Sequence, residues 1–161
     1  MTVDMGAIGR ADAAEKVAIV ADDRTVTFGE LEARSNRLAH VLIDLGVEPL
    51  DRVAVMLPNG AEFLETGIAT AKAAAELVPV NRHLKRDEVA WILADSGARV
   101  LVTDTSYGDV VAGALEAAPD CTAVIVGSSD ERDYERLLDA APAARPAREG
   151  FGSPEYFFYT S

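Results

Sequence analysis

The sequence predicts an α/β fold, in which helices flank a mostly parallel sheet. Short runs rich in β-branched residues alternate along the chain with longer segments whose apolar residues recur every three or four positions. Strands that alternate with helices are typical of parallel sheets, because each crossover helix returns the chain to the same edge. With 161 residues, of which 49% are hydrophobic, the chain has the size of one domain with its own core.

The composition excludes several classes of protein. The 15 basic and 27 acidic side chains give a net charge of −12, which argues against nucleic-acid binding because phosphate contacts need a basic face. The apolar fraction is too high for a disordered chain, and Cys121 has no second cysteine with which to form a disulfide. No segment has the roughly 20 uncharged residues of a transmembrane helix, and residues 1–10 do not resemble a signal peptide. We therefore expect a cytoplasmic protein.

The first predicted elements are two short strands and a long helix. The strands, over residues 17–20 and 25–27, flank a turn-prone acidic segment. Thr27 and Glu30 have the spacing of a capping box, which predicts that the helix begins here. Gly46 follows the apolar stripe of this helix, at the place where a left-handed glycine commonly ends a helix.

A buried strand and a second helix come next. Residues 52–57 predict the strand. Asn59 and Glu62 repeat the capping spacing, so the second helix is predicted to begin there and to extend to about Ala75. Its many small residues indicate close packing against a neighbouring sheet or helix.

The middle of the chain predicts a short strand and a third helix. The strand covers residues 77–80, and Pro79 indicates an end or edge position because proline cannot donate to a sheet ladder. Acidic residues at Asp87 and Glu88 mark the first turn of the helix, and Gly97 marks its end.

The last third of the chain continues the alternation. Ser128 and Glu131 again have the capping spacing, ahead of a short helix. The predicted elements are a strand over 99–103, a helix around 110–115, a strand over 122–126, a helix around 134–138, a linker or surface loop over 140–150 and an aromatic strand over 155–160.

The residues taken alone do not form a complete catalytic constellation. The sequence has no dinucleotide-binding glycine pattern, P-loop lysine or nucleophile elbow. His40 lies in the long helix and is interpreted as structural. His83, beside Arg82 and Lys85, could bind a phosphate, but a solvated turn is the favoured interpretation. Cys121 is interpreted as a small hydrophobic residue, with no metal site at any of these positions.

Five segments nevertheless carry motifs in a fixed order. They are Val-Thr-Phe-Gly-Glu-Leu with Arg-Ser-Asn-Arg-Leu-Ala at 26–39, the strand region at 46–59, Ala-Lys-Ala-Ala-Ala with Val-Pro-Val-Asn at 71–81, Asp-Ser-Gly-Ala-Arg-Val-Leu-Val-Thr-Asp at 95–104 and Tyr-Thr-Ser at 159–161. Together they resemble the N-terminal portion of the adenylate-forming enzymes, which include acyl-CoA synthetases, luciferases and peptide-synthetase adenylation domains. Asn81, where peptide-synthetase domains tend to carry Asp, favours the acyl-CoA synthetase branch.

The resemblance implies a function and a site. Thr160 and Ser161 would begin the loop that binds the ATP phosphates, so we expect residues 1–161 to be the N-terminal part of the domain, ending within that loop. The intact parent would be an ATP-dependent carboxylate–CoA ligase that forms an acyl-adenylate and then an acyl-CoA, with ATP, Mg²⁺ and CoA as cofactors and a carboxylic acid as substrate. The chain alone is expected to be inactive, to bind none of these tightly, and to contribute no catalytic residue or metal ligand.

Two further expectations complete the prediction. Ala74 stands where the family usually has glycine, which calls the helix-to-strand packing at that point into question. An alternative hypothesis is a non-catalytic α/β interaction module, or a split-gene product that docks with a separate partner. In that case the aromatic strand over 155–160 would be exposed and would promote self-association.

Overall fold

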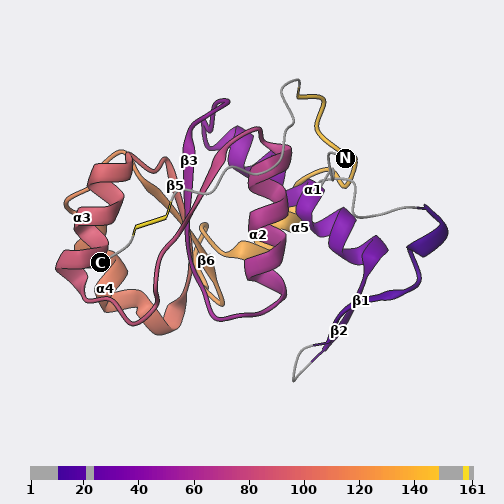
Figure 1. Ribbon diagram of the computed structural model, residues 1–161, viewed down its shortest axis with the longest axis horizontal. Helices are drawn as coiled ribbons and strands as arrows, with labels where there is room; N and C mark the ends of the chain where they lie inside the picture. Colours follow the sequence, from indigo (N-terminus) through magenta and orange to yellow (C-terminus); the bar gives the residue numbers. More distant parts are fainter. Residues whose placement is uncertain (1–10, 21–23, 149–157, 160–161) are drawn as a thin grey trace.

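A computed structural model describes residues 11–20, 24–148 and 158–159 of the chain (Figure 1). Its elements alternate as the sequence predicts. Their bounds are η2 Ala11–Ala13, β1 Val17–Val20, β2 Thr25–Thr27, α1 Phe28–Asp44, β3 Arg52–Met56, α2 Ala61–Lys72, β4 Glu76–Pro79, α3 Arg86–Ser96, β5 Val100–Asp104, η3 Thr105–Tyr107, α4 Gly108–Leu115, β6 Thr122–Val126 and α5 Tyr134–Ala140.

Four of the strands form one parallel sheet, in the order β4-β3-β5-β6. Val53 of β3 lies opposite Leu77 on one side and Val100 on the other. β4 is an edge strand of this sheet, so the edge position predicted from Pro79 is confirmed. β1 and β2 form a separate antiparallel hairpin. The predicted fold class, an α/β fold with a mostly parallel sheet, is therefore confirmed.

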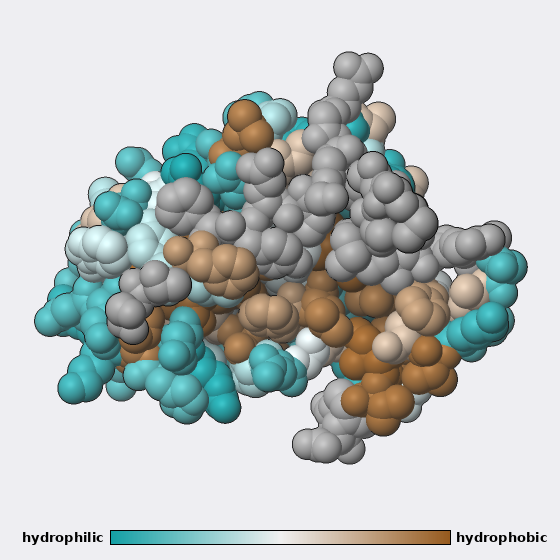
Figure 2. Space-filling view, viewed as in Figure 1, coloured by the Kyte–Doolittle hydropathy of each residue, from teal (hydrophilic) through white to brown (hydrophobic). Residues whose placement is uncertain are grey.

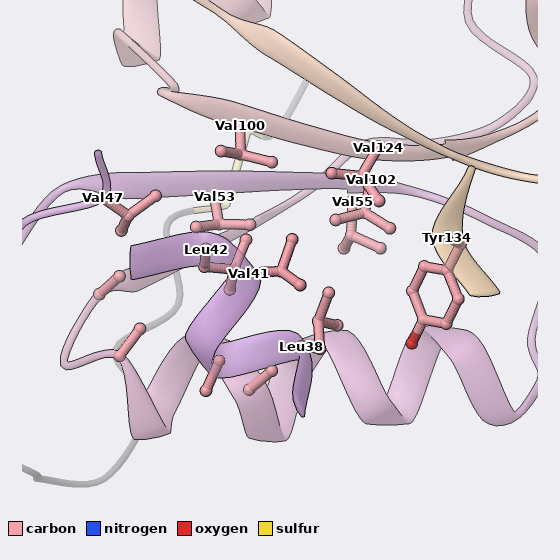
Figure 3. Close-up of a cluster of buried hydrophobic side chains, with 14 of the residues drawn as sticks. Leu38, Val41, Leu42, Val47, Val53, Val55, Val100, Val102, Val124 and Tyr134 are labelled. Atoms are coloured by element: carbon pink, nitrogen blue, oxygen red, sulfur yellow. The ribbon is translucent and has the colours of Figure 1, made fainter. Parts of the chain in front are cut away.

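The sheet lies between two helical layers (Figure 1). Because side chains alternate along a strand, Val53 and Val55 face α1, α2 and α5, while Ala54 and Met56 face α3 and α4. Figure 3 shows the first of these two cores, in which valines of three strands meet Leu38 and its neighbours on α1.

The start of α1 agrees with the sequence in detail. The Thr27 N–H donates to Glu30 Oε2 at 2.7 Å, and the Glu30 N–H donates to Thr27 Oγ1 at 3.2 Å. Both bonds of the capping box are thus present. Gly46 follows the helix with φ of +88°, the left-handed conformation expected there.

The predicted bounds of α2 are wrong at both ends. Gly60, with an extended backbone, is the N-cap and makes no side-chain capping bond, while the Glu62 carboxylate pairs with Arg24. The helix ends at Lys72 and not near Ala75, because Ala74 has φ of +59° and turns the chain into β4. A glycine, which the resemblance implies at this position, would adopt the left-handed backbone without strain, so the departure at Ala74 concerns backbone conformation as well as the helix-to-strand packing.

The predicted capping residue of α5 is also wrong. Asp133 is the N-cap and accepts a hydrogen bond from the Arg136 N–H at 2.9 Å. Ser128 instead accepts from the Asp130 N–H in the turn before the helix. Aspartate is as good a helix cap as serine, so the choice depends on where the chain leaves β6.

The segment after α5 lies along α1. The Asn36 side chain donates to the Ala143 carbonyl at 2.9 Å, and Arg148 donates to the carbonyls of Val47 at 2.8 Å and Ala73 at 2.9 Å. Of the strand predicted over 155–160, only two residues are described, and neither lies in a strand. The rest of that prediction lies outside the described residues.

Candidate functional site

A cavity of about 520 Å³ opens at the carboxyl end of β4, beside α3. Ligands of open parallel sheets bind outside the carboxyl ends of the strands, which makes this groove the candidate site. Its lining is mostly apolar. The walls include Pro79 and Asn81 after β4, then Leu84, Trp91 and Ile92 along α3, and Tyr159 near the end of the chain.

Trp91 and Asp95 hold Tyr159 against α3. Its ring meets the ring of Trp91 edge to face, with the centroids 5.3 Å apart and an interplanar angle of 83°. Its hydroxyl donates to Asp95 Oδ2 at 2.8 Å. Burial and this hydrogen bond raise the pKa of Tyr159, so the hydroxyl is protonated and able to donate at neutral pH.

The turn between β4 and α3 shapes the near wall of the groove. Asn81 Oδ1 accepts a hydrogen bond from the His83 N–H at 3.0 Å, which closes an Asx turn. Lys85 precedes α3, and its N–H donates to Glu88 Oε2 at 2.8 Å. Arg82 and His83 are exposed in this turn and do not line the groove, so the structure favours the solvated-turn interpretation of His83.

The predicted site residues Thr160 and Ser161 lie outside the described residues. The structure does place Tyr159, which immediately precedes them, in the groove. The sequence did not single out Trp91, and Asp95 was noted only as the first residue of the Asp-Ser-Gly-Ala-Arg-Val motif. Their spacing of four residues within one predicted helix, with one of them the only tryptophan of the chain, was the signal available in the sequence.

The structure assigns a structural role to the remaining candidates. His40 Nε2 donates to the Ala144 carbonyl at 2.9 Å, as predicted for a hydrogen-bonded structural histidine. Cys121 is 8% exposed, and burial raises the pKa of its thiol to about 12, so it is a protonated hydrophobic residue and not a nucleophile.

A second cluster of charges lies between α1, α2 and α5. Arg34 Nε donates to Glu65 Oε1 at 2.7 Å, and the other end of its guanidinium makes two bonds to Glu135, at 2.7 and 2.9 Å. The Tyr134 hydroxyl donates to Glu65 Oε2 at 2.7 Å, and in Figure 3 it points towards α2. These partners hold the pKa of Arg34 above its usual range and lower that of Glu135. Arg24 Nη2 also lies 3.8 Å from Glu65 Oε1, so the cluster joins the three helices to the residue before β2.

Lys72 completes the polar interior of the same layer. Its side chain is buried, and Nζ lies 2.8 Å from Ser35 Oγ, 2.6 Å from Asn36 Oδ1 and 2.9 Å from Glu32 Oε2. Each of these contacts is a good hydrogen bond or ion pair, so Lys72 joins α2 to α1.

Within 11–20, 24–148 and 158–159, no three His, Cys, Asp or Glu side chains are grouped in a way that could hold a metal ion. No helix in this part of the chain is long and apolar enough to cross a membrane.

Comparison with known proteins extends these observations. The 3-oxocholest-4-en-26-oate–CoA ligase of Rhodococcus rhodochrous is 34% identical over 155 residues, which cover 91% of this chain and 28% of the relative. A benzoate CoA ligase from Burkholderia xenovorans LB400 has the same fold, with a TM-score of 0.81 and 27% identity over 93% of this chain and 31% of that chain. The ATP-bound structure of MatB from Rhodopseudomonas palustris gives a TM-score of 0.75 at 26% identity, over 89% of this chain and 29% of that chain.

Each of these three proteins is matched over only a limited share of its length. The chain spans less than a third of the length of each of these proteins. A family model described as "AMP-binding enzyme" matches residues 9–161, which is nearly the whole of this chain. The chain therefore belongs to the AMP-binding enzyme family.

Proposed function

We propose that this chain forms the N-terminal part of an ATP-dependent carboxylate–CoA ligase. The observation that carries the proposal is the place of Tyr159, the first residue of the Tyr-Thr-Ser motif, in the groove at the carboxyl edge of the sheet. The CoA ligases among its relatives and structural neighbours support the same reaction class. The proposal also places the protein in the cytoplasm, where an unpaired Cys121 stays reduced.

The proposed reaction has two steps. A carboxylate attacks the α-phosphorus of ATP and gives an acyl-adenylate and pyrophosphate; the thiol of CoA then displaces AMP and gives the acyl-CoA. Mg²⁺ would accompany the nucleotide and neutralise phosphate charge. The contribution of this chain would be to bind and orient: the hydroxyls of Thr160 and Ser161 can donate to phosphate oxygens, and Tyr159 holds the start of their segment.

The chain alone does not complete a triphosphate site. None of the described residues that line the groove is basic, and Asp87 and Glu88 add negative charge to its wall. With a net charge of −12, two hydroxyls cannot offset the charge of a triphosphate. We infer that tight ATP binding needs further groups, and that the 161-residue chain has no adenylation activity of its own.

The test is an acid-dependent ATP–pyrophosphate exchange assay on two proteins. The 161-residue chain should exchange at the rate of a buffer control. The coding DNA beyond the codon for Ser161 should then be read, and any in-frame continuation expressed. This continued product should catalyse ATP–pyrophosphate exchange when a carboxylic acid is added.

Substituting Thr160→Val in the continued product should lower the exchange rate, while Thr122→Val, at an exposed hydroxyl at the start of β6, should not. Exchange by the 161-residue chain alone, or none by the continued product, would contradict the proposal.

A second candidate function is a non-catalytic module that associates with itself or with a separate partner. Two exposed apolar regions support it: Val17 and Val20 of the hairpin are 54% and 78% exposed, and Phe158 is 67% exposed. Figure 2 shows strongly apolar side chains gathered at the hairpin end of the visible face. Sedimentation velocity at high concentration tests self-association. A monomer would argue against it, and if dimers form, Val20→Lys and Phe158→Lys identify the surface involved.

A further inference from the structure

The face of α3 that lines the groove carries two residues that both contact Tyr159. Trp91 and Asp95 are four residues apart on this helix, so their side chains lie on the same face, one turn apart. Trp91 contacts the ring of Tyr159, and Asp95 accepts a hydrogen bond from its hydroxyl. We call this pair the Tyr159 seat.

The two contacts act on different ends of the Tyr159 side chain. An edge-to-face ring pair at 5.3 Å fixes the plane of the ring, because the positive edge of one ring faces the negative face of the other. A hydroxyl-to-carboxylate bond of 2.8 Å fixes the far end of the ring along a defined direction. A side chain held at both places leaves its own backbone little freedom.

The backbone of Tyr159 is the point from which the predicted phosphate loop continues. Successive Cα atoms are 3.80 Å apart, so the position of Tyr159 limits where the next residues can start. We propose that Trp91 and Asp95 are positioning residues, which seat Tyr159 against α3 and thereby fix the start of the phosphate loop. The inference rests on the proposed function in one respect only: it takes the segment that begins at Thr160 to be a phosphate loop.

The seat also links the two sequence motifs that border the groove. Asn81 lies at the start of the β4–α3 turn, and Tyr159 lies against the far end of α3. Because α3 is a single helix of 11 residues between them, it sets the separation of the two groove walls. A substitution in the seat should therefore change the position of the loop start without altering the Asn81 turn.

The experiment uses the only tryptophan of the chain as a quencher. In the 161-residue chain, Ser161→Cys is labelled with bimane, whose emission is quenched strongly when an indole ring lies almost in contact; Tyr159 is present in both the labelled chain and its Trp91→Phe reference, so the difference between them reports Trp91. Ser161 is two residues beyond Tyr159, so its Cα stays within about 7 Å of the Tyr159 Cα, and seating Tyr159 beside Trp91 therefore brings the label close to the indole ring. Cys121 is buried and its thiol is protonated at neutral pH, so it should not react. The same protein with Trp91→Phe gives the unquenched reference.

The seat predicts a distinct result for each variant. The labelled chain should be several-fold dimmer than its Trp91→Phe reference. Asp95→Ala should shift the ratio of seated to unseated chains about fivefold, as expected for the loss of one net hydrogen bond, and should brighten the label. Tyr159→Leu should restore the reference emission. The matched control is Asp87→Ala, which removes a carboxylate from the same helix and the same groove about two turns before Asp95, and should leave the label dim.

Two results would overturn the inference: a label that stays dim in Asp95→Ala, or equal brightening in Asp87→Ala. Urea unfolding of each variant checks that α3 remains folded, and Tyr159→Phe, which removes only the hydroxyl, provides a second test of the hydrogen bond. The measurement needs no nucleotide, so it is independent of the proposed function. If the label is quenched as predicted but the continued product shows no exchange activity, the ligase proposal is refuted and the Tyr159 seat is kept. If the continued product shows exchange but the label is not quenched, the seat is refuted and the ligase proposal is kept.

Discussion

The two helical layers that cover the sheet are built in different ways. Of the described residues, the two charged side chains that are fully buried, Glu65 and Lys72, both belong to α2, and both are surrounded by partners from α1 or α5. In the α3–α4 layer the buried residues are apolar apart from Ser96 and Thr103, and the charged side chains are at the surface. The groove and the Tyr159 seat lie in this second layer.

The buried charges of one layer and the apolar contacts of the other have different structural consequences. Buried ion pairs have strict geometric requirements, because a charge left without a partner in the interior is costly, so they fix how α1, α2 and α5 meet. An apolar contact surface tolerates small shifts, and it leaves Trp91 and Asp95 free to contact another part of the chain. We interpret the layer of α1, α2 and α5 as the rigid support of the sheet. We interpret the α3–α4 layer as the one that binds Tyr159 and carries the groove.

The largest expected effect contrasts one glutamate from each layer. Glu65→Ala removes a fully buried carboxylate from between Arg34 and Tyr134. It should lower the free energy of unfolding by about 3 kcal/mol, towards the low end for a broken buried pair because Arg34 keeps Glu135. Urea unfolding followed by circular dichroism gives the value.

The matched control is Glu116→Ala. Glu116 is 74% exposed and pairs with Arg86 of α3 at 2.9 Å, so its removal should cost less than about 1 kcal/mol. Equal losses for the two substitutions would show that the layers do not differ in the way proposed.

The next effect is a loss of stability at alkaline pH, with one titrating group in each layer. Burial raises the pKa of Cys121, in the α3–α4 core, from 9.0 to about 12, and burial together with Glu65 raises that of Tyr134 well above 10.0. A raised folded-state pKa contributes stability that is complete below the unfolded-state value and is lost as the pH rises through the folded-state value. The part due to Cys121 should therefore fall from pH 9 towards pH 12, by about 2 kcal/mol at pH 10.5.

Urea unfolding between pH 8 and 11, under reducing conditions, separates the two groups. Cys121→Ala should remove the decline that begins near pH 9, and Tyr134→Phe should remove only the part that begins near pH 10. An unchanged pH profile in Cys121→Ala would mean that the thiol is not buried in the α3–α4 core.

A smaller effect concerns the ends of α2 and α3, where both helices turn back into the sheet. Gly97 ends α3 with φ of +62°, whereas α2 is followed by Ala74 with φ of +59°. A left-handed alanine is strained by about 1–2 kcal/mol, part of which is offset by the greater flexibility of glycine in the unfolded chain. Ala74→Gly should therefore raise the free energy of unfolding by about 0.5–1 kcal/mol.

The reciprocal substitution, Gly97→Ala, should lower the free energy of unfolding by a similar amount. A Cβ at this position would meet no atom within 4 Å, so the cost is purely conformational. Opposite shifts of the urea midpoint in the two variants would support the comparison, while a loss in Ala74→Gly would show that the methyl group is needed for packing.

Ala74 also illustrates how far sequence reasoning extends. The period of apolar residues predicted every strand of the parallel sheet, because it reflects which face of an element is buried. Helix ends were less predictable: Asn59 and Ser128 have suitable side chains, yet Gly60 and Asp133 are the caps. A cap depends on where the preceding strand releases the chain, which local spacing does not record.

The site was only partly predictable for a related reason. The resemblance of Tyr159 to the first residue of a phosphate loop is visible in the sequence, but its contacts with Trp91 and Asp95 join residues more than sixty positions apart. The buried cluster around Glu65 likewise cannot be read from the sequence, because a glutamate in an amphipathic helix is normally solvated. Contacts of this kind follow from the tertiary fold and not from local pattern.

The smallest expected effect tests how α3 and α4 are joined. A Cβ at Gly113 of α4 would lie 2.6 Å from Arg86 Cδ, so Gly113→Ala forces the Arg86 side chain aside and weakens its exposed ion pair with Glu116. The loss of that pair, up to about 1 kcal/mol, opposes a gain of about 0.5–1 kcal/mol from replacing a helical glycine. The free energy of unfolding should thus change by less than about 0.5 kcal/mol.

In an Arg86→Ala background nothing opposes the gain, and Gly113→Ala should then stabilise the protein by the full amount. Since a flexible surface cation can move aside and a buried one such as Lys72 cannot, a large loss from Gly113→Ala alone would mean that the α3–α4 layer is as rigidly joined as the α1–α2 layer.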